Sequence, residues 1–380
     1  MRDPIYAHIR KQQQHLVKLI QNLVECESPS DDPAAVNRFV DLVAASVSGL
    51  ANVRTFPGGG FGRHVQCEFL LPSPKKHGRI LALGHSDTVW PVGTLRTMPF
   101  RAAGGRLWGP GVLDMKAGIA FFIYAMRAIV ELDLPVRRRV VLQLNSDEEA
   151  GSDSSRPLTE RTARSSVAVL VLEPGAGLEG KAKTARKGIG GYTLRVHGIA
   201  SHACVDFAAG ASAVVELARQ IQRLAGFTGL RRGVTVNPGT VRGGTRTNVI
   251  AAEAEAGIDF RVPTLADFRS LDRRMHALRP FDRRCRLELS GGLNRPPMER
   301  NRGVLSIYRK ARQLAAELGV ELEESSTGGG SDGNFTAALG VPTLDGIGAV
   351  GEGAHAAHES ILISRIADRA ALLAKLVLAI

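Results

Sequence analysis

The sequence predicts an α/β protein with a mostly parallel central sheet and a smaller α+β domain inserted into it. Three observations predict this. Apolar strand-like segments alternate with helix-like segments in the first half of the chain, the pattern changes near Gly188, and helix and strand patterns return from about Asn301. At 380 residues the chain is long enough for two domains.

The first part of the chain alternates between helix and strand patterns. We expect amphipathic helices over 8–26 and 33–50, strands over 63–72 and 78–89, a helix over 116–132, and strands over 137–149 and 167–175. The strand over 78–89 begins as an almost wholly apolar run, which indicates burial on both faces. In such sheets, ligands gather at the carboxyl ends of the strands.

The middle of the chain has a different order. We expect a strand over 190–198, a helix over 211–226, strands over 233–244 and 252–263, a helix over 265–278 and a strand over 284–292. This is the ferredoxin-like split arrangement. The inserted domain is expected to cover 188–297, with 1–187 and 298–380 forming the larger domain. We expect it to make a homodimer, because its edge strand would be free to pair with a partner.

Composition narrows the class of protein. No apolar run approaches the ~20 residues of a membrane span, and the N-terminus lacks an apolar signal-peptide core, so we expect a cytoplasmic protein. The net charge of +12 comes from short, dispersed arginine clusters without interleaved aromatic residues. We therefore expect no nucleic-acid partner, and interpret the charge as a solvated surface or as steering of an anionic substrate. The four cysteines form no C-x-x-C pair and are interpreted as scattered thiols.

Acids and histidines follow the predicted strands and recur near the C-terminus. They are His85 and Asp87 in HSDTV, Asp114 in GPGVLDMKAG, Glu148 and Glu149 in NSDEEAGS, Glu173 in LEPG, and His355 in GEGAHAAHE. Carboxylate and imidazole ligands without thiolate suit zinc or a similar divalent metal in an open, catalytic site. A metal-dependent hydrolase is the leading hypothesis.

Each of these residues also has a simpler interpretation. His85 and Asp87 lie on the same side of a strand end, either as a ligand with its orienting acid or as a structural hydrogen bond. Asp114 suits the N-cap of the helix that follows, and a carboxylate could cap the helix and bridge two metals together. Glu148 and Glu149 could be surface acids. Alternatively, one is a ligand and the other a general base.

The order of these motifs resembles the dinuclear-zinc peptidase and deacylase family. HSDTV, GPGVLDMKAG, DEEAGS, LEPG, GIASHA, GGGSDGN and GEGAHAAHE occur in succession, and the resemblance covers roughly 84–359. The family includes glutamate carboxypeptidase, acetylornithine deacetylase, succinyl-diaminopimelate desuccinylase and the aminoacylases. HSDTVWPVG, MPFRAAGGRLWGPG and TGGGSDGN look most like the glutamate carboxypeptidase branch.

The resemblance implies a zinc-peptidase-like catalytic domain that holds two zinc ions, with cobalt or manganese as possible substitutes. Its ligand sets are His85, Asp114 and Glu173 for one ion and Asp114, Glu149 and His355 for the other, with Asp114 bridging. Glu148 corresponds to the catalytic base and Asp87 to the acid that orients His85. The Asp114–Met115 bond is a candidate for a cis peptide. Of the two histidines in GEGAHAAHE, His355 fits the pattern of a histidine four residues before glutamate, and His358 does not.

The resemblance also implies residues that contact the substrate. His202 would cross the dimer to stabilise an oxyanion, Asn248 and Arg261 would bind the substrate, and the loop at Gly330 and Ser331 would present backbone N–H groups. Lys187 and Arg295 are weaker candidates, and Lys116 is interpreted as structural.

The expected activity is hydrolysis of an amide bond in a small peptide or N-acyl amino acid, releasing a C-terminal or N-acylated amino acid. The alternatives are a deacetylase or desuccinylase of N-acyl amino acids, an aminopeptidase, and a metal-free relative that serves as a binding or scaffolding protein. The complete ligand set argues against the scaffold.

Overall fold

The computed structural model describes residues 3–73 and 75–380, which form two compact units. The main unit comprises Met1–Ala185, Arg300–Thr327 and Ser331–Ile380, and the inserted unit comprises Arg186–Glu299 and Gly328–Gly330. The inserted unit thus extends two residues beyond the expected segment at each end. It also includes a piece of the glycine-rich loop, because Arg186 Nη1 donates to the carbonyl oxygens of Gly329 (3.3 Å) and Gly330 (3.0 Å).

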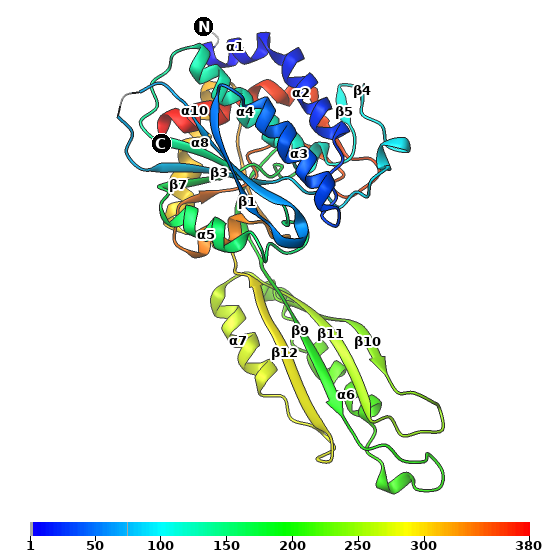
Figure 1. The fold of residues 1–380 in the computed structure, drawn as a ribbon. Coiled ribbons are helices and arrows are strands. Elements are labelled where there is room, and N and C mark those ends of the chain that lie inside the picture. The colour runs from blue at the N-terminus through cyan, green and yellow to red at the C-terminus, as the bar shows by residue number, and fades with distance from the viewer. Residues whose placement is uncertain (1–2, 74) are drawn as a thin grey trace. The chain divides into compact units, whose positions relative to one another are not determined.

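The main unit is built on a six-stranded sheet with the order β1-β2-β6-β3-β7-β14 (Figure 1). Its strands are β1 (Ala51–Pro57), β2 (Arg63–Phe69), β3 (Arg79–His85), β6 (Arg139–Asn145), β7 (Ala168–Val171) and β14 (Thr343–Leu344). The β6/β3, β3/β7 and β7/β14 pairs are parallel, whereas β1/β2 and β2/β6 are antiparallel. The mostly parallel sheet expected from the sequence is confirmed.

The central strand β3 is buried on both faces of this sheet. Ile80 and Ala82 of β3 belong to the main hydrophobic core, and the alternate residues Leu81 and Leu83 belong to a second core that includes Ala163. The main core contains α1 (Pro4–Lys11), α2 (Gln13–Glu25), α3 (Pro33–Ser46), α4 (Ala117–Glu131), α8 (Arg302–Glu317) and α10 (Ile366–Ala379). The second core takes its helical side chain from α5 (Arg156–Arg164), and α9 (Gly333–Ala338) follows the glycine-rich loop.

The N-terminal helix differs from the expected 8–26. It begins at Pro4, because the Asp3 side chain accepts hydrogen bonds from the N–H groups of Ile5 and Tyr6, and it breaks at Gln12 into α1 and α2.

Two small sheets complete the main unit. One has the order β15-β16-β5-β4, from β4 (Arg101–Ala103), β5 (Arg106–Trp108), β15 (Gly351–Glu352) and β16 (Ser360–Leu362). The other pairs β8 (Ala182–Arg186) with β13 (Glu324–Thr327). The β15-β16-β5-β4 sheet helps to form the site, because its antiparallel β16/β5 pair brings the C-terminal segment beside the loop that follows Trp108.

The inserted unit has the ferredoxin-like split arrangement. Its elements are β9 (Gly188–His197), α6 (Ala213–Ala225), β10 (Thr235–Gly243), β11 (Glu253–Val262), α7 (Leu265–His276) and β12 (Arg286–Arg295). The four strands form an antiparallel sheet in the order β10-β11-β9-β12, and both helices lie on one face of it (Figure 1). Leu217 of α6 and Leu271 of α7 share a core with Leu194 and Ile258 of the sheet.

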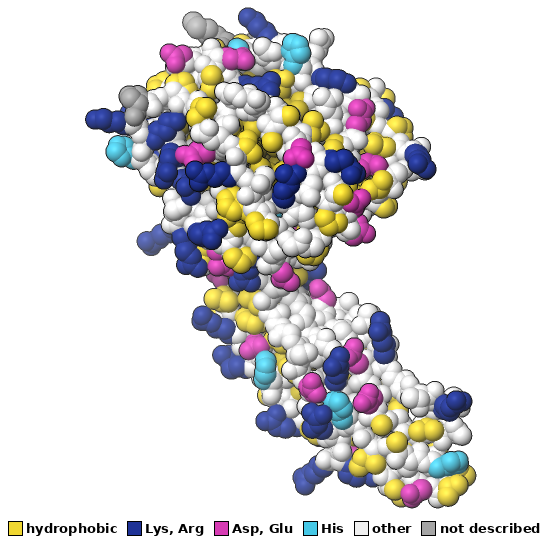
Figure 2. Space-filling model, viewed as in Figure 1, with side chains coloured by type: hydrophobic (Ala, Val, Ile, Leu, Met, Phe, Trp, Pro, Cys, Tyr) yellow, Lys and Arg dark blue, Asp and Glu magenta, His cyan; other side chains and the backbone are white. Residues whose placement is uncertain are grey.

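The surface carries charges of both signs. Figure 2 shows Lys and Arg side chains interspersed with Asp and Glu side chains on the visible face, rather than gathered in one basic patch. Among the described residues, no helix is both long and apolar enough to cross a membrane.

Candidate metal centre

The candidate ligands of the main unit converge at one edge of its sheet. His85 is the last residue of β3, the loop after β6 carries Glu148 and Glu149, and Glu173 follows β7. Because β3 pairs in parallel with both β6 and β7, the carboxyl ends of these strands meet.

Two further ligand candidates come from loops. Asp114 lies between β5 and α4, and His355 lies between β15 and β16. The Asp114–Met115 peptide bond is cis, as expected. His355 has φ 61°, a left-handed conformation that is uncommon outside glycine and that clusters at functional sites.

The Asp114 carboxylate lies between two separate histidine–glutamate pairs. Its Oδ1 is 3.2 Å from His85 Nε2, which is also 3.5 Å from Glu173 Oε1. Its Oδ2 is 3.5 Å from His355 Nε2, which is also 3.1 Å from Glu149 Oε1. The five side chains therefore form two groups of three donor atoms that share Asp114.

The spacing fits tetrahedral zinc. With zinc–ligand bonds of about 2.0–2.1 Å, two ligand atoms on one ion are separated by about 3.3 Å. The four distances from the histidine nitrogens to carboxylate oxygens run from 3.1 to 3.5 Å. One ligand atom each from His85, Asp114 and Glu149 also lie within 4.8 Å of one another. The residues present thus fit a divalent metal centre.

The histidines and acids of the centre perturb one another's pKa values. Burial lowers the pKa of His85, but hydrogen bonds with Asp114, Asp87 and Glu173 raise it well above its usual value. Hydrogen bonds with Asp114 and Glu149 raise the pKa of His355 to about 10. Burial raises the pKa of Glu149, and the hydrogen bond with His355 opposes that change. For Asp114, burial acts to raise the pKa, but the hydrogen bonds with His355 and His85 outweigh it and lower the pKa.

These shifts predict that zinc binding releases protons at pH 8. The pKa of His355 is 6.5 in the unfolded chain and about 10 in the metal-free fold, so its ion pairs stabilise the metal-free fold below about pH 6.5 and are lost as the pH rises through 10. Zinc requires the neutral imidazole and must displace that proton. Calorimetric titration of zinc at pH 8 should give a binding enthalpy that depends on the ionisation enthalpy of the buffer. His355→Ala should release about one proton fewer per chain, and equal proton release from both proteins would contradict the prediction.

Asp87 is fully buried and contacts both His85 and the loop after β6. The acceptor nearest His85 Nδ1 is the carbonyl oxygen of Asp87 at 2.9 Å, with the carboxylate Oδ1 at 3.6 Å. The carboxylate accepts from the N–H groups of Glu148 (3.2 Å) and Glu149 (3.1 Å), and from Ser30 Oγ (2.7 Å). Asp87 thus fixes the main chain of the Glu148–Glu149 loop in addition to its contact with the histidine.

Sequence reasoning missed a second anchor of this loop. Asp332, which is buried, accepts hydrogen bonds from Ser152 Oγ and Asn145 Nδ2, which lie on either side of Glu148 in the chain. Asn145 also donates to Thr159 Oγ1. The only available signal was the polar Asn145 at the end of an apolar strand, which requires buried partners.

The inserted unit places His202 and Asn248 on neighbouring strand-like segments. His202 forms a β-bridge with Val249, and the N–H of Ala203 donates to the carbonyl oxygen of Asn248 (3.0 Å). His202 Nδ1 accepts from the N–H groups of Cys204 (3.2 Å) and Val205 (3.1 Å). A neutral His202 therefore carries its proton on Nε2.

The other substrate-contact candidates already have partners. Arg261 forms a bidentate pair with Asp259, with Nε–Oδ2 and Nη2–Oδ1 distances of 3.0 and 3.2 Å. Ser331 is fully buried, its N–H donates to Asn334 Oδ1 (3.0 Å), and its hydroxyl donates to Asp345 Oδ2 (2.6 Å). In this structure the polar groups of Ser331 support the glycine-rich loop, and its N–H already has an acceptor in Asn334.

The basic candidates differ in their environment. Lys187 Nζ donates to the carbonyl oxygen of Gly233 (2.6 Å), and Arg295 is buried in the inserted unit. Lys116 is buried, donates to the carbonyl oxygen of Cys26 (2.8 Å) and lies over the Phe39 ring, which fits a structural role.

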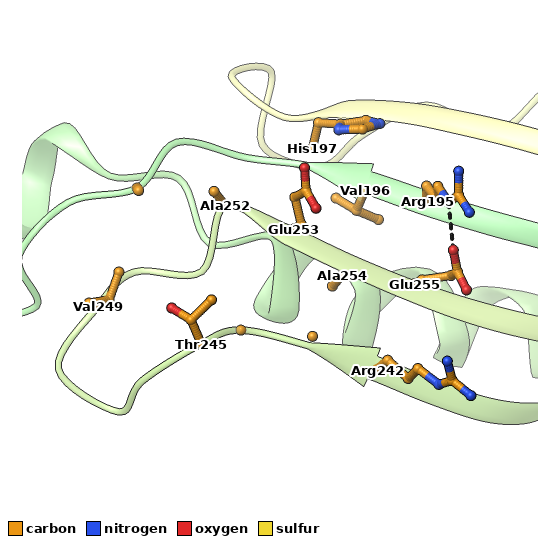
Figure 3. Close-up of a pocket in the computed structure, with 13 residues that line it drawn as sticks. Arg195, Val196, His197, Arg242, Thr245, Val249, Ala252, Glu253, Ala254 and Glu255 are labelled. Carbon is orange, nitrogen blue, oxygen red and sulfur yellow. Dashed lines mark hydrogen bonds and ion pairs between the residues drawn. The ribbon is translucent and has the colours of Figure 1, made fainter.

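A pocket of about 520 Å³ lies in the inserted unit and contains none of the metal-centre residues. Its lining includes Arg195, His197, Arg242, Glu253 and Glu255, and Figure 3 shows Arg195 paired with Glu255 across neighbouring strands. Because its charges are mixed and one pair is already satisfied, the pocket selects no particular ligand chemistry.

Residues 81–379 match the family described as Peptidase family M20/M25/M40. The chain belongs to this family. It is 27% identical over 376 residues to carboxypeptidase G2 of Pseudomonas sp. (strain RS-16), covering 97% of this chain and 89% of the relative. It is 32% identical over 273 residues to succinyl-diaminopimelate desuccinylase of Nitrosomonas eutropha, covering 67% of this chain and 71% of that enzyme.

Solved structures of this family share the fold. Aminopeptidase PepT from Bacillus cereus superposes with a TM-score of 0.79 at 22% identity, covering 96% of this chain and 98% of that one. The M20 family metallo-carboxypeptidase Sso-CP2 from Sulfolobus solfataricus superposes with a TM-score of 0.70 at 17% identity, covering 95% and 98%. The chain is therefore a hydrolytic enzyme of a metallopeptidase family, with a candidate metal site formed by histidine, aspartate and glutamate.

Proposed function

We propose that this enzyme is a dinuclear-zinc amidohydrolase that releases a C-terminal or N-acylated amino acid, as a glutamate carboxypeptidase does. The observation that carries the proposal is the Asp114 carboxylate, whose two oxygens face different histidines at 3.2 and 3.5 Å. His85, Asp114 and Glu173 would hold one ion, and Asp114, Glu149 and His355 the other. Cobalt or manganese would suit the same carboxylate-rich donors.

Glu148 is the proposed general base. Its neighbour Glu149 contacts His355 and is assigned as a ligand, which leaves Glu148 for proton transfer. Zinc, when bound, would lower the pKa of a water molecule and polarise the scissile carbonyl. Glu148 accepts the proton of the attacking water and passes it to the leaving amine.

His202 is the proposed oxyanion donor, acting across a homodimer. With Nδ1 occupied by two backbone N–H groups, its Nε2–H is the group that can donate to a developing negative charge. Dimerisation through β10 is supported by its place at the sheet edge and by exposed apolar side chains on this strand and α6, namely Val241 (59% exposed), Val214 (42%) and Val215 (52%).

Mixing two inactive variants tests this arrangement. His202→Ala is expected to lower kcat by about 10²–10³ with a smaller change in KM, because the oxyanion forms only in the transition state. If His202 serves the partner's site, random exchange of subunits between His202→Ala and Glu148→Ala dimers should restore about a quarter of native activity. Half of the dimers would then be mixed, and each mixed dimer would hold one complete site out of two. No recovery, with subunit exchange verified by labelled chains, would contradict trans action. Light scattering that shows a monomer would also contradict trans action.

The substrate is proposed to be a small peptide or N-acyl amino acid with a free carboxylate, which Arg261 would bind after exchanging its contact with Asp259. A relative that aligns with 97% of this chain is a carboxypeptidase by name, and a desuccinylase is the second candidate because relatives of that name reach 32% identity. Hydrolysis should be tested with N-acyl glutamates, N-succinyl diamino acids, and dipeptides blocked at either end. Cleavage of carboxylate-blocked but not amine-blocked dipeptides would indicate an aminopeptidase and overturn the proposal.

A further inference from the structure

The buried carboxylate of Glu359 lies against the loop that carries Asp114. Its side chain is fully buried. Oε2 accepts from the N–H of Gly111 (2.9 Å) and from Trp90 Nε1 (2.9 Å). Oε1 accepts from the N–H groups of Leu113 (2.8 Å) and Asp114 (3.1 Å). One side chain therefore accepts hydrogen bonds from three backbone N–H groups within four residues of the Asp114 loop.

This loop depends on an external acceptor. Gly111 has φ 70°, a left-handed conformation that glycine adopts without steric cost, and it turns the chain just before Asp114. A buried N–H left without a partner destabilises the fold, and a carboxylate binds N–H donors roughly twice as strongly as a neutral acceptor. Each oxygen of Glu359 accepts two of the four hydrogen bonds.

One C-terminal segment contacts both the main chain and the side chain of Asp114. Glu359 accepts from the Asp114 N–H, while His355, four residues earlier, lies 3.5 Å from Asp114 Oδ2. The segment is fixed beside the loop because Ser360 of β16 pairs with Trp108 of β5.

We propose that Glu359 is a positioning residue. It holds the main chain of Asp114 so that the two carboxylate oxygens face His85 and His355. The inference rests on the proposed function, because it assumes that Asp114 bridges two ions. A displaced Asp114 would weaken both sites together, whereas loss of an ordinary buried hydrogen bond would lower only the stability of the fold.

Glu359→Gln tests the inference. The amide places an NH₂ group against two of the four donors, so the Asp114 loop must shift. We expect zinc affinity, measured against a chromophoric chelator, to fall by about 10–100-fold, and kcat at saturating zinc to fall with it. Trp90→Phe is the matched control, because it removes the one donor outside the loop; its zinc affinity should stay native.

The outcomes separate this inference from the function it rests on. A Glu359→Gln protein with a lower Tm but native zinc affinity would overturn the positioning role. If Asp114→Ala also retains its zinc, the proposed function fails as well; if Asp114→Ala loses zinc, only the present inference fails. Should Glu359→Gln not fold, Glu359→Asp keeps the charge but cannot reach all four donors. Reduced zinc affinity there supports the inference, and native affinity overturns it.

Discussion

Glu148→Ala is expected to retain its metal ions and lose nearly all turnover. A positioned general base contributes about 10²–10⁴ in rate, so kcat should fall by at least that range. Metal content should be unchanged, because Glu148 is assigned as the base and is not among the five residues assigned as ligands. The measurements are kcat on the best of the candidate peptide and N-acyl amino acid substrates, and the zinc content per chain by elemental analysis.

An exposed acid on the same loop provides the control. Asp153 is close to Glu148 in the chain but is solvent-exposed. The Asp153→Ala variant loses this carboxylate, and its kcat should stay close to that of the native enzyme. An active Glu148→Ala enzyme, or one that has lost zinc, would refute the assignment of Glu148 as the base.

Asp114→Ala is expected to abolish binding of both metal ions. Its two oxygens contact different histidines, so each group of three donor atoms would be left with two. By contrast, Glu173→Ala and His355→Ala should each weaken one site, because each lies in one group only. Zinc titration of the three variants is the measurement. Asp114→Ala should lose affinity at both sites, and each of the other two variants should retain one strong site.

His358→Ala is the matched histidine control for His355→Ala. It lies three residues later in the same segment and should keep both ions. If only His358→Ala lost zinc, the choice of His355 as a ligand would be wrong. If Asp114→Ala lost a single ion, the bridging assignment would be wrong.

Much of the fold could be predicted because local pattern and burial coincide. The apolar run of β3 is buried on both faces of a sheet, and the alternating strand β9 has one face on a core. The strands β4, β5, β15 and β16 could not be predicted, because segments of two or three residues carry no periodicity and the sheet depends on β16 pairing with β5, far away in the chain. The break at Gln12 has no Gly or Pro to signal it in the sequence.

The candidate ligands could be proposed from the sequence because each follows a strand or occurs in a recognisable motif. Of the groups that hold these ligands in place, Asp87 could be proposed as well, whereas the contacts of Glu359 and Asp332 could not. Glu359 binds the N–H of Asp114 across 245 residues, and Asp332 binds Asn145 across 187. Ser331 also looked available for a substrate in a glycine-rich loop, but Asn334 and Asp345 hold its polar groups. Such contacts depend on the tertiary fold, and the residue types alone do not specify them.

The proposed function depends on Asp114 joining two metal sites in one centre. The most direct test is to reconstitute the protein by stepwise addition of zinc, remove loosely bound metal, and measure the zinc content per chain. We expect two tightly bound ions per chain in the native protein and none in Asp114→Ala. A single ion in the native protein, or two ions that survive Asp114→Ala, would contradict it.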